Sequence, residues 1–95
     1  DTFAPLGPAL LLTKELPKET RVVTRLNGKV VQDGAIEQMI FPIPRLISHI
    51  SRFAALEEGD IISTGTPQGV GEIKAGDLIE VEVEPIGMLK NICSE

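Results

Sequence analysis

Aromatic residues are scarce in this 95-residue chain, which has no Trp, no Tyr and only three Phe. Any hydrophobic core must therefore be aliphatic and built from Ile, Leu and Val. Hydrophobic residues still make up 42 % of the chain, an ordinary share for a globular protein and too high for an intrinsically disordered one. A chain of this length forms one domain at most and buries a modest part of its surface, so we expect it to need further sequence or a partner subunit.

Basic patches, paired cysteines and long apolar runs are also missing. The net charge is −5 and the Lys and Arg residues stand singly, which argues against nucleic-acid binding. The single cysteine, Cys93, excludes an internal disulfide and favours a reducing compartment such as the cytoplasm. Apolar runs such as 9–12 and 53–56 are far shorter than the roughly 20 residues of a membrane helix, so the sequence predicts no membrane span.

Alternating and β-branched segments predict a sheet. Residues 21–26 and 29–32 flank Asn27-Gly28, the dipeptide typical of a tight hairpin turn. Residues 78–84 alternate cleanly, with Ile79, Val81 and Val83 predicted to face inward. Further short strands are predicted at 9–13, 38–41, 60–63 and 88–92, and turns at 33–34, 75–77 and 85–87.

The hydrophobic period changes from two residues to 3.6 after Pro42. Apolar residues then recur at helical spacing and predict one α-helix from Pro44 to Leu56. Pro44 suits the first helical turn, where its missing N–H is not needed. Six or seven short strands with one helix predict a mostly β, α+β fold that is largely antiparallel.

The segment from Thr64 to Gly71 is the strongest candidate for a binding site. Its three glycines let backbone N–H groups approach an anion closely, two threonine hydroxyls add donors, and Pro67 stiffens the turn. Such a loop suits a carboxylate or enolate oxygen. The alternative is a plain connection between two strands, which is what most loops are.

Other polar residues have more ordinary roles open to them. His49, the only histidine, has the chemistry of a general base, but a partly buried, non-catalytic side chain is the more common role. Glu80, Glu82 and Glu84 share one strand face, and such rows are usually solvated rather than metal-binding, since a hard cation needs oxygens that converge. Cys93 has no base near it in sequence, which argues against a nucleophile.

Several segments, taken in order, resemble one family. They are Asp-Thr-Phe-Ala-Pro-Leu-Gly-Pro (1–8), Leu-Asn-Gly-Lys-Val-Val-Gln-Asp-Gly (26–34), Met-Ile-Phe (39–41), Gly-Asp-Ile-Ile-Ser-Thr-Gly-Thr-Pro-Gln-Gly-Val-Gly (59–71), Ala-Gly-Asp (75–77) and Gly-Met-Leu-Lys-Asn (87–91). The chain is similar over essentially its whole length to the C-terminal part of the fumarylacetoacetate hydrolase family. The 59–71 segment is the most specific of these motifs.

The resemblance implies that residues 1–95 are the C-terminal portion of a catalytic domain, with a mixed β-sandwich roll that usually forms a dimer. Members hydrolyse, decarboxylate or isomerise small β-diketo, 2-oxo and 2-hydroxydienoate acids, often in aromatic catabolism, with Mg²⁺, Mn²⁺ or Ca²⁺ holding the substrate oxygens. The second threonine of the Thr-Gly-Thr segment reaches the substrate in that family. By resemblance, Thr66, flanked by Gly65 and Pro67, is the expected substrate-binding position.

The family's catalytic and metal-binding residues lie upstream of the segments present in this sequence. The resemblance therefore assigns no catalytic residue and no metal ligand to this chain, and we expect the chain alone to be inactive. Because Asp1 is not Met, we also expect a longer polypeptide or a missing N-terminal part. Two hypotheses remain: a portion of a metal-dependent enzyme that works as a homodimer or with that missing part, and a non-catalytic fragment that keeps the fold for binding or assembly.

Overall fold

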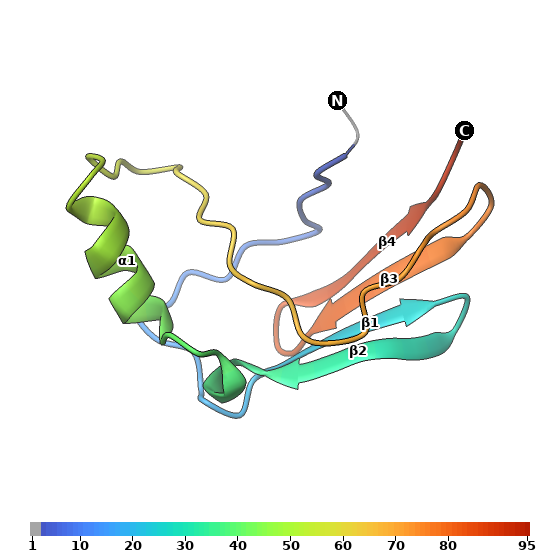
Figure 1. The fold of residues 1–95 in the computed structure, drawn as a ribbon, viewed down its shortest axis with the longest axis horizontal. Helices are drawn as coiled ribbons and strands as arrows, with labels where there is room; N and C mark the ends of the chain where they lie inside the picture. Colours follow the sequence, from blue (N-terminus) through green and yellow to red (C-terminus); the bar gives the residue numbers. More distant parts are fainter. Residues whose placement is uncertain (1–2) are drawn as a thin grey trace.

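One four-stranded antiparallel sheet organises the molecule (Figure 1). The computed structural model describes residues 3–95, so Asp1 and Thr2, which open the first family-like motif, lie outside it. The strands are β1 (Arg21–Leu26), β2 (Lys29–Ala35), β3 (Leu78–Val83) and β4 (Gly87–Ile92), in the spatial order β2-β1-β3-β4. The described residues also form a short 3₁₀ helix, η1 (Ile36–Gln38), and one α-helix, α1 (Ile43–Ser51). The predicted mostly antiparallel fold with one α-helix is confirmed.

The turn between β1 and β2 forms at Asn27-Gly28 as the sequence predicts. Both residues have positive φ, 51° at Asn27 and 84° at Gly28. The Asn27 side chain also ties the hairpin to the start of β3. It donates to Asp77 Oδ1 at 2.9 Å and accepts from the Leu78 N–H at 2.8 Å. This turn therefore fixes the register of two strand pairs at once.

The two faces of the sheet differ in chemistry. Strand register places Thr24 and Leu26 of β1 beside Val81 and Ile79 of β3 on one face, which is mostly apolar. The opposite face carries three cross-strand ion pairs. They are Arg21–Asp33, Arg25–Glu82 and Lys90–Glu80, at 2.7, 3.2 and 3.1 Å. Ile79 of β3 faces the side of the sheet on which Thr66 and residues 69–73 lie, although all six residues of β3 are half-buried.

Two predicted strands, one predicted turn and one predicted extended stretch are absent from the described residues. Segments 9–13 and 60–63 pair with no other strand among the described residues, so the sheet has four strands rather than six or seven. Asp33 and Gly34 are not a turn, because they pair with Val23 and Val22 inside β2. The predicted extended stretch at 38–41 is replaced by η1 and bends.

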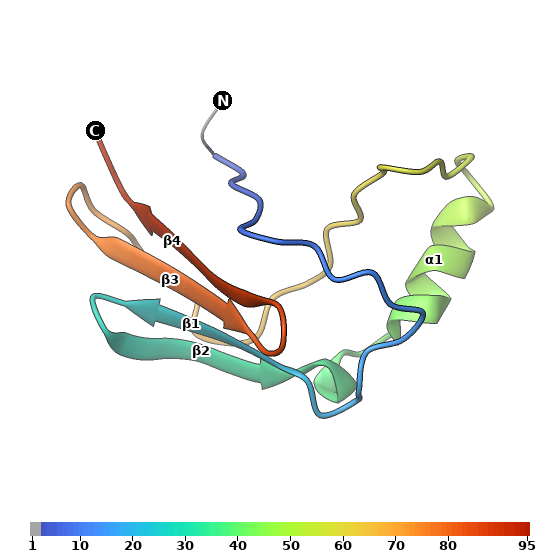
Figure 2. The ribbon, with the colours of Figure 1, turned by 180° about the vertical axis from the view of Figure 1, so that it is seen from behind.

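The α-helix is shorter than predicted and ends at Ser51 instead of Leu56. The N–H groups of Arg52 and Phe53 bond the carbonyls three residues back, so the helix tightens into a turn at that point. Figures 1 and 2 show α1 standing at one end of the molecule, apart from the sheet. Its apolar face is not covered by the described strands, and Ile47 is 43 % exposed.

Burial within residues 3–95 is slight. Ala35 is the only buried hydrophobic residue there, and no large side chain is fully enclosed. Many large apolar side chains face outward instead. Those exposed by half or more are Phe3, Leu6, Leu10, Leu12, Ile40, Phe53, Ile61, Val70, Ile73 and Ile92. Within the described part of the chain, no helix is long and apolar enough to cross a membrane.

Candidate functional site

Residues Thr64–Gly71, the Thr66 loop, cross the apolar face of the sheet as an irregular segment between α1 and β3 (Figure 1). No regular hydrogen-bonding pattern holds this segment. Its position depends instead on contacts with β2, at three residues spaced along that strand. These contacts are what place the predicted substrate-binding residue Thr66.

Two glycines allow the close approach between the loop and β2. A Cβ added at Gly34 of β2 would lie 2.9 Å from Pro67 Cγ, so Pro67 packs where only a glycine leaves room. A Cβ added at Gly69 would overlap the carbonyl oxygen of Val31, and Gly69 has a φ of +109° that side chains rarely adopt. Pro67 and Gly69 therefore fix the loop from both sides of Gln68.

A β-bulge in β2 meets the loop at this point. The register pairs Thr24 with Gln32 and Arg25 with Val30, which leaves Val31 as the extra residue. A bulge bends its strand and changes the direction of nearby groups. Here the carbonyl of the extra residue lies against Gly69, so the irregularity of the strand and the glycine of the loop fit one another.

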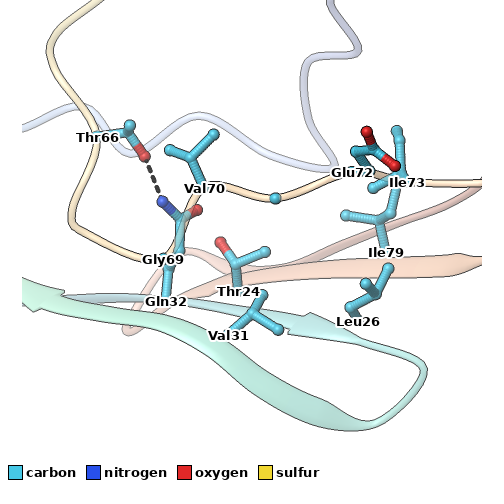
Figure 3. A pocket seen from close by; sticks show the side chains of 11 residues that line it. Thr24, Leu26, Val31, Gln32, Thr66, Gly69, Val70, Glu72, Ile73 and Ile79 are labelled. Carbon is cyan, nitrogen blue, oxygen red and sulfur yellow. Dashed lines mark hydrogen bonds between the residues drawn. The ribbon is translucent and has the colours of Figure 1, made fainter.

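Gln32 joins the strand to the loop by hydrogen bonds. Its side-chain Nε2 donates to Thr66 Oγ1 at 2.9 Å and to the carbonyl oxygen of Pro67 at 2.7 Å. Figure 3 shows the first of these bonds, with the amide of Gln32 rising from β2 toward Thr66. Gln32 is half-buried, whereas Thr66 is exposed. The Thr66 hydroxyl is thus held by a hydrogen bond on the side that faces the sheet and is exposed on the opposite side.

A hollow of about 180 Å³ lies between the loop and the sheet. Its lining is mostly apolar and comes from β1, β2, β3 and the loop, with Glu72 at the end away from Thr66 (Figure 3). The lining residues are Thr24, Leu26, Val31, Gln32, Thr66, Gly69, Val70, Gly71, Glu72, Ile73 and Ile79. The hollow therefore has an apolar floor with a pair of hydrogen-bonding side chains, Gln32 and Thr66, at one end and the carboxylate of Glu72 at the other.

The two threonines of the loop differ in what their hydroxyls do. Thr64 Oγ1 donates to the carbonyl of its own neighbour, Gly65, at 3.3 Å. Thr66 Oγ1 accepts from Gln32. A Cβ added at Gly65 would meet nothing within 4 Å, so the backbone between the two threonines is open to close approach. Thr66 is therefore the better placed of the two to donate to a bound molecule.

The other polar candidates lie elsewhere. His49 is exposed on α1 and stacks edge-on against Phe53, with ring centroids 5.3 Å apart, at the opposite end of the molecule from the hollow. Glu80 and Glu82 do not converge, because each is engaged in its own ion pair. Glu80 is also less exposed than a solvated row predicts, with a side chain only 13 % accessible. Within residues 3–95, no group of three His, Cys, Asp or Glu side chains is arranged to hold a metal ion, so these residues do not fit a metal centre.

The predicted site residues have different structural roles. Thr66 lies at the polar end of the hollow, Pro67 docks the loop, and Gly65 is exposed and uncrowded. Gln32 was not predicted as a site residue, although it lies in the 26–34 motif. No local signal marks Gln32, because β2 also contains Lys29 and Asp33 and does not alternate, and the partner of Gln32 lies 34 residues further along the chain.

The family model for the fumarylacetoacetate hydrolase C-terminal domain matches residues 1–93. An uncharacterized protein of Pyrococcus abyssi is 52 % identical over 91 residues, covering 95 % of this chain and 40 % of its own length. Oxaloacetate tautomerase YisK of Bacillus subtilis is 43 % identical over 100 residues, covering 96 % of this chain and 33 % of its own length.

Solved structures give the same result for the fold. The crystal structure of 5-carboxymethyl-2-hydroxymuconate delta-isomerase from Mycobacterium smegmatis superposes with a TM-score of 0.91 and 40 % sequence identity. The match covers 99 % of this chain and 37 % of the isomerase chain. The chain thus spans 40 % or less of the length of each of these three proteins.

Proposed function

The chain belongs to the fumarylacetoacetate hydrolase family, and we propose that the whole protein is an enzyme acting on small 2-oxo acids that holds an anionic substrate oxygen at Thr66. The observation that carries this proposal is the arrangement of the Thr66 hydroxyl. It is exposed on a loop that Gly69 and Pro67 dock against β2, and Gln32 holds its oxygen at 2.9 Å. A donor fixed in this way loses little freedom when a substrate binds.

We propose keto–enol tautomerisation as the reaction class. Two members named above, an oxaloacetate tautomerase and a hydroxymuconate isomerase, carry names that denote the movement of a proton rather than the cleavage of a carbon–carbon bond. In such a step a C–H bond beside the carbonyl breaks, its electron pair forms a C=C bond, and the carbonyl electrons move to oxygen. A base accepts the proton released from carbon, and the enolate oxygen then takes up a proton to give the enol; the same steps in reverse give the ketone.

The contribution of this chain to that step is electrostatic. Negative charge grows on the substrate oxygen as the C–H bond breaks, and a hydroxyl donor stabilises the charged form more than the neutral ketone. Thr66 supplies that donor in the proposal. We assign no general base among the described residues near Thr66. In this proposal, the group that accepts the proton belongs to another part of the whole protein.

We also propose that a divalent cation such as Mg²⁺, Mn²⁺ or Ca²⁺, where the whole protein uses one, takes its ligands from outside this chain. Mg²⁺ needs near-octahedral oxygen ligands, and the described residues offer no such group. Calorimetric titration of the 95-residue chain with Mg²⁺ and Mn²⁺ tests this. We expect weak binding at most, and a specific micromolar site would contradict the assignment.

We further propose that the whole protein assembles through its exposed apolar side chains. Apolar side chains are exposed around α1 and along residues 3–12. We propose that a second copy of the chain in a homodimer covers them, or that additional sequence does so, because the longer relatives carry such sequence. Light scattering of the whole protein in solution tests the dimer, and a monomer at high concentration would contradict it. The half-buried free Cys93 suits a reducing compartment such as the cytoplasm, which fractionation of the source cells would check.

The direct experiment is an assay of the whole protein with oxaloacetate, following the loss of enol absorbance in the ultraviolet. We expect the enzyme to accelerate conversion well above the buffer rate. A series of acylpyruvates, assayed for C–C cleavage, is the parallel test for hydrolysis. Activity on neither class would contradict the enzyme proposal and favour the alternative of a non-catalytic fragment that serves binding or assembly.

A further inference from the structure

Gln32 makes two hydrogen bonds that together determine how its amide is oriented. The carbonyl oxygen of Pro67 can only accept, so the atom 2.7 Å from it must be the amide nitrogen. The amide nitrogen carries two protons, and the second reaches Thr66 Oγ1 at 2.9 Å. The flipped amide would place its oxygen against the Pro67 carbonyl, which is repulsive.

This orientation has a consequence for Thr66. A hydroxyl has one proton and two acceptor positions, and Gln32 occupies an acceptor position. The Thr66 proton then has to point away from Gln32, and no acceptor for it is found among residues 3–95. A hydroxyl that already accepts a hydrogen bond is also polarised into a better donor. By occupying an acceptor position, Gln32 therefore makes the Thr66 hydroxyl, which could otherwise donate or accept, a donor with a fixed direction.

The strand holds Gln32 itself in place. Its backbone pairs with Thr24 of the neighbouring strand, and its side chain emerges directly after the bulge at Val31. Because Gly69 lies against the Val31 carbonyl and beside the Gln32 side chain, the strand and the loop cannot shift independently. The position of β2 therefore determines where the Gln32 amide lies, and the amide in turn orients the Thr66 hydroxyl.

We propose that Gln32 is a positioning residue for substrate binding, which acts by directing the Thr66 hydroxyl proton toward an anionic substrate oxygen. Gln32 does not touch the substrate in this role. The inference rests on the proposed function of Thr66, and it holds for any substrate that presents a carboxylate or enolate oxygen there. It separates Gln32 from Pro67 and Gly69, whose contacts only dock the loop.

A double-mutant cycle in the whole protein tests the inference, with oxaloacetate as the probe. Gln32→Met keeps the length of the side chain and removes both donors. In the wild-type background we expect kcat/KM to fall about tenfold, the worth of one hydrogen bond. In a Thr66→Val background, where no hydroxyl remains to direct, the further loss should be less than about twofold. In a Thr66→Ser background the tenfold cost should return, because serine restores the hydroxyl.

Two outcomes would overturn it in distinguishable ways. An equal cost of Gln32→Met in all three backgrounds means that Gln32 only docks the loop through Pro67, while the proposed function stands. A Thr66→Val variant with normal kcat/KM removes the proposed function and this inference together. Gln38→Met is the matched control, since Gln38 accepts only from the Ala35 N–H, and its effect should be on melting alone. Gln32→Asn, which withdraws the same amide by one carbon, carries the same expectations if Gln32→Met fails to fold.

Discussion

Two regions of the molecule differ in how many contacts hold their residues: the sheet with its docked loop, and the helix with its flanking segments. In the first, three cross-strand ion pairs, a bulge and two tightly packed glycines determine where each residue lies. In the second, Ile40 is 90 % and Phe53 80 % exposed, and α1 stands apart from the strands (Figure 2). Both belong to one chain of 95 residues.

The difference separates what this chain specifies from what it leaves to other contacts. The Thr66 loop obtains its geometry from contacts with β2, so the shape of this proposed substrate-binding loop is a property of the chain itself. The apolar side chains of α1 and of residues 3–12 have no such partners among the described residues, and Leu6, Leu10 and Leu12 are exposed. Substitutions should therefore be costly in the first region and nearly neutral in the second, when they are measured in this chain.

Gly69→Ala should have the largest effect on folding. The added Cβ overlaps the Val31 carbonyl and sits at a φ of +109°, so strain and overpacking together should cost roughly 2–5 kcal/mol of unfolding free energy. Chemical denaturation measures it. Gly59→Ala, with a φ of +91° but open space, isolates the strain, and Gly71→Ala, with neither, should be neutral or slightly stabilising. A cost at Gly69 no greater than at Gly59 would mean that the loop is not docked.

Val81→Ala against Ile40→Ala compares the two regions directly. Val81 is half-buried in β3 between β1 and β4, so losing two methyl groups there should cost about 1–2 kcal/mol. Ile40 is exposed, and its change should stay within about 0.5 kcal/mol. Thermal melts of both variants provide the measurement. Equal costs would show that the helix region is packed as well as the sheet.

Acid should weaken the hairpin through Asp77. The hydrogen bond from Asn27, and secondarily that from the Lys74 N–H, lower the pKa of the Asp77 carboxyl below its ordinary value of 3.8. A lowered pKa stabilises the fold fully above the ordinary value, and this stabilisation is lost as the pH falls through the lowered one. Asp77→Asn should therefore be less stable at neutral pH, with the difference from wild type shrinking below about pH 4. Glu58→Gln is the exposed control, and a difference that stays constant with pH would contradict the account.

Sequence reasoning predicted the elements whose signals are local. Asn27-Gly28, the alternation of 78–84 and the period change after Pro42 correctly indicated the hairpin, β3 and the helix. It failed where the structure of a segment depends on pairing with a distant strand. Residues 9–13 and 60–63 have strand-like composition but no neighbouring strand in the described chain, whereas Asp33-Gly34 has turn-like composition and is held extended by β1. The motif pointed to the Thr66 loop, but the role of Gln32 depends on a bulge and a contact 34 residues apart, which no local pattern encodes.

The most direct test of the central claim is the kinetics of Thr66→Val in the whole protein. Valine keeps the shape and removes the hydroxyl, so we expect kcat/KM with oxaloacetate to fall on the order of 10²-fold while stability changes by about 1 kcal/mol or less. Thr66→Ser should retain most activity, and Thr64→Val should matter less because Thr64 bonds its own neighbour. Near-normal kcat/KM for Thr66→Val, or a loss of folding large enough to explain the lost turnover, would contradict the claim that this hydroxyl binds the substrate.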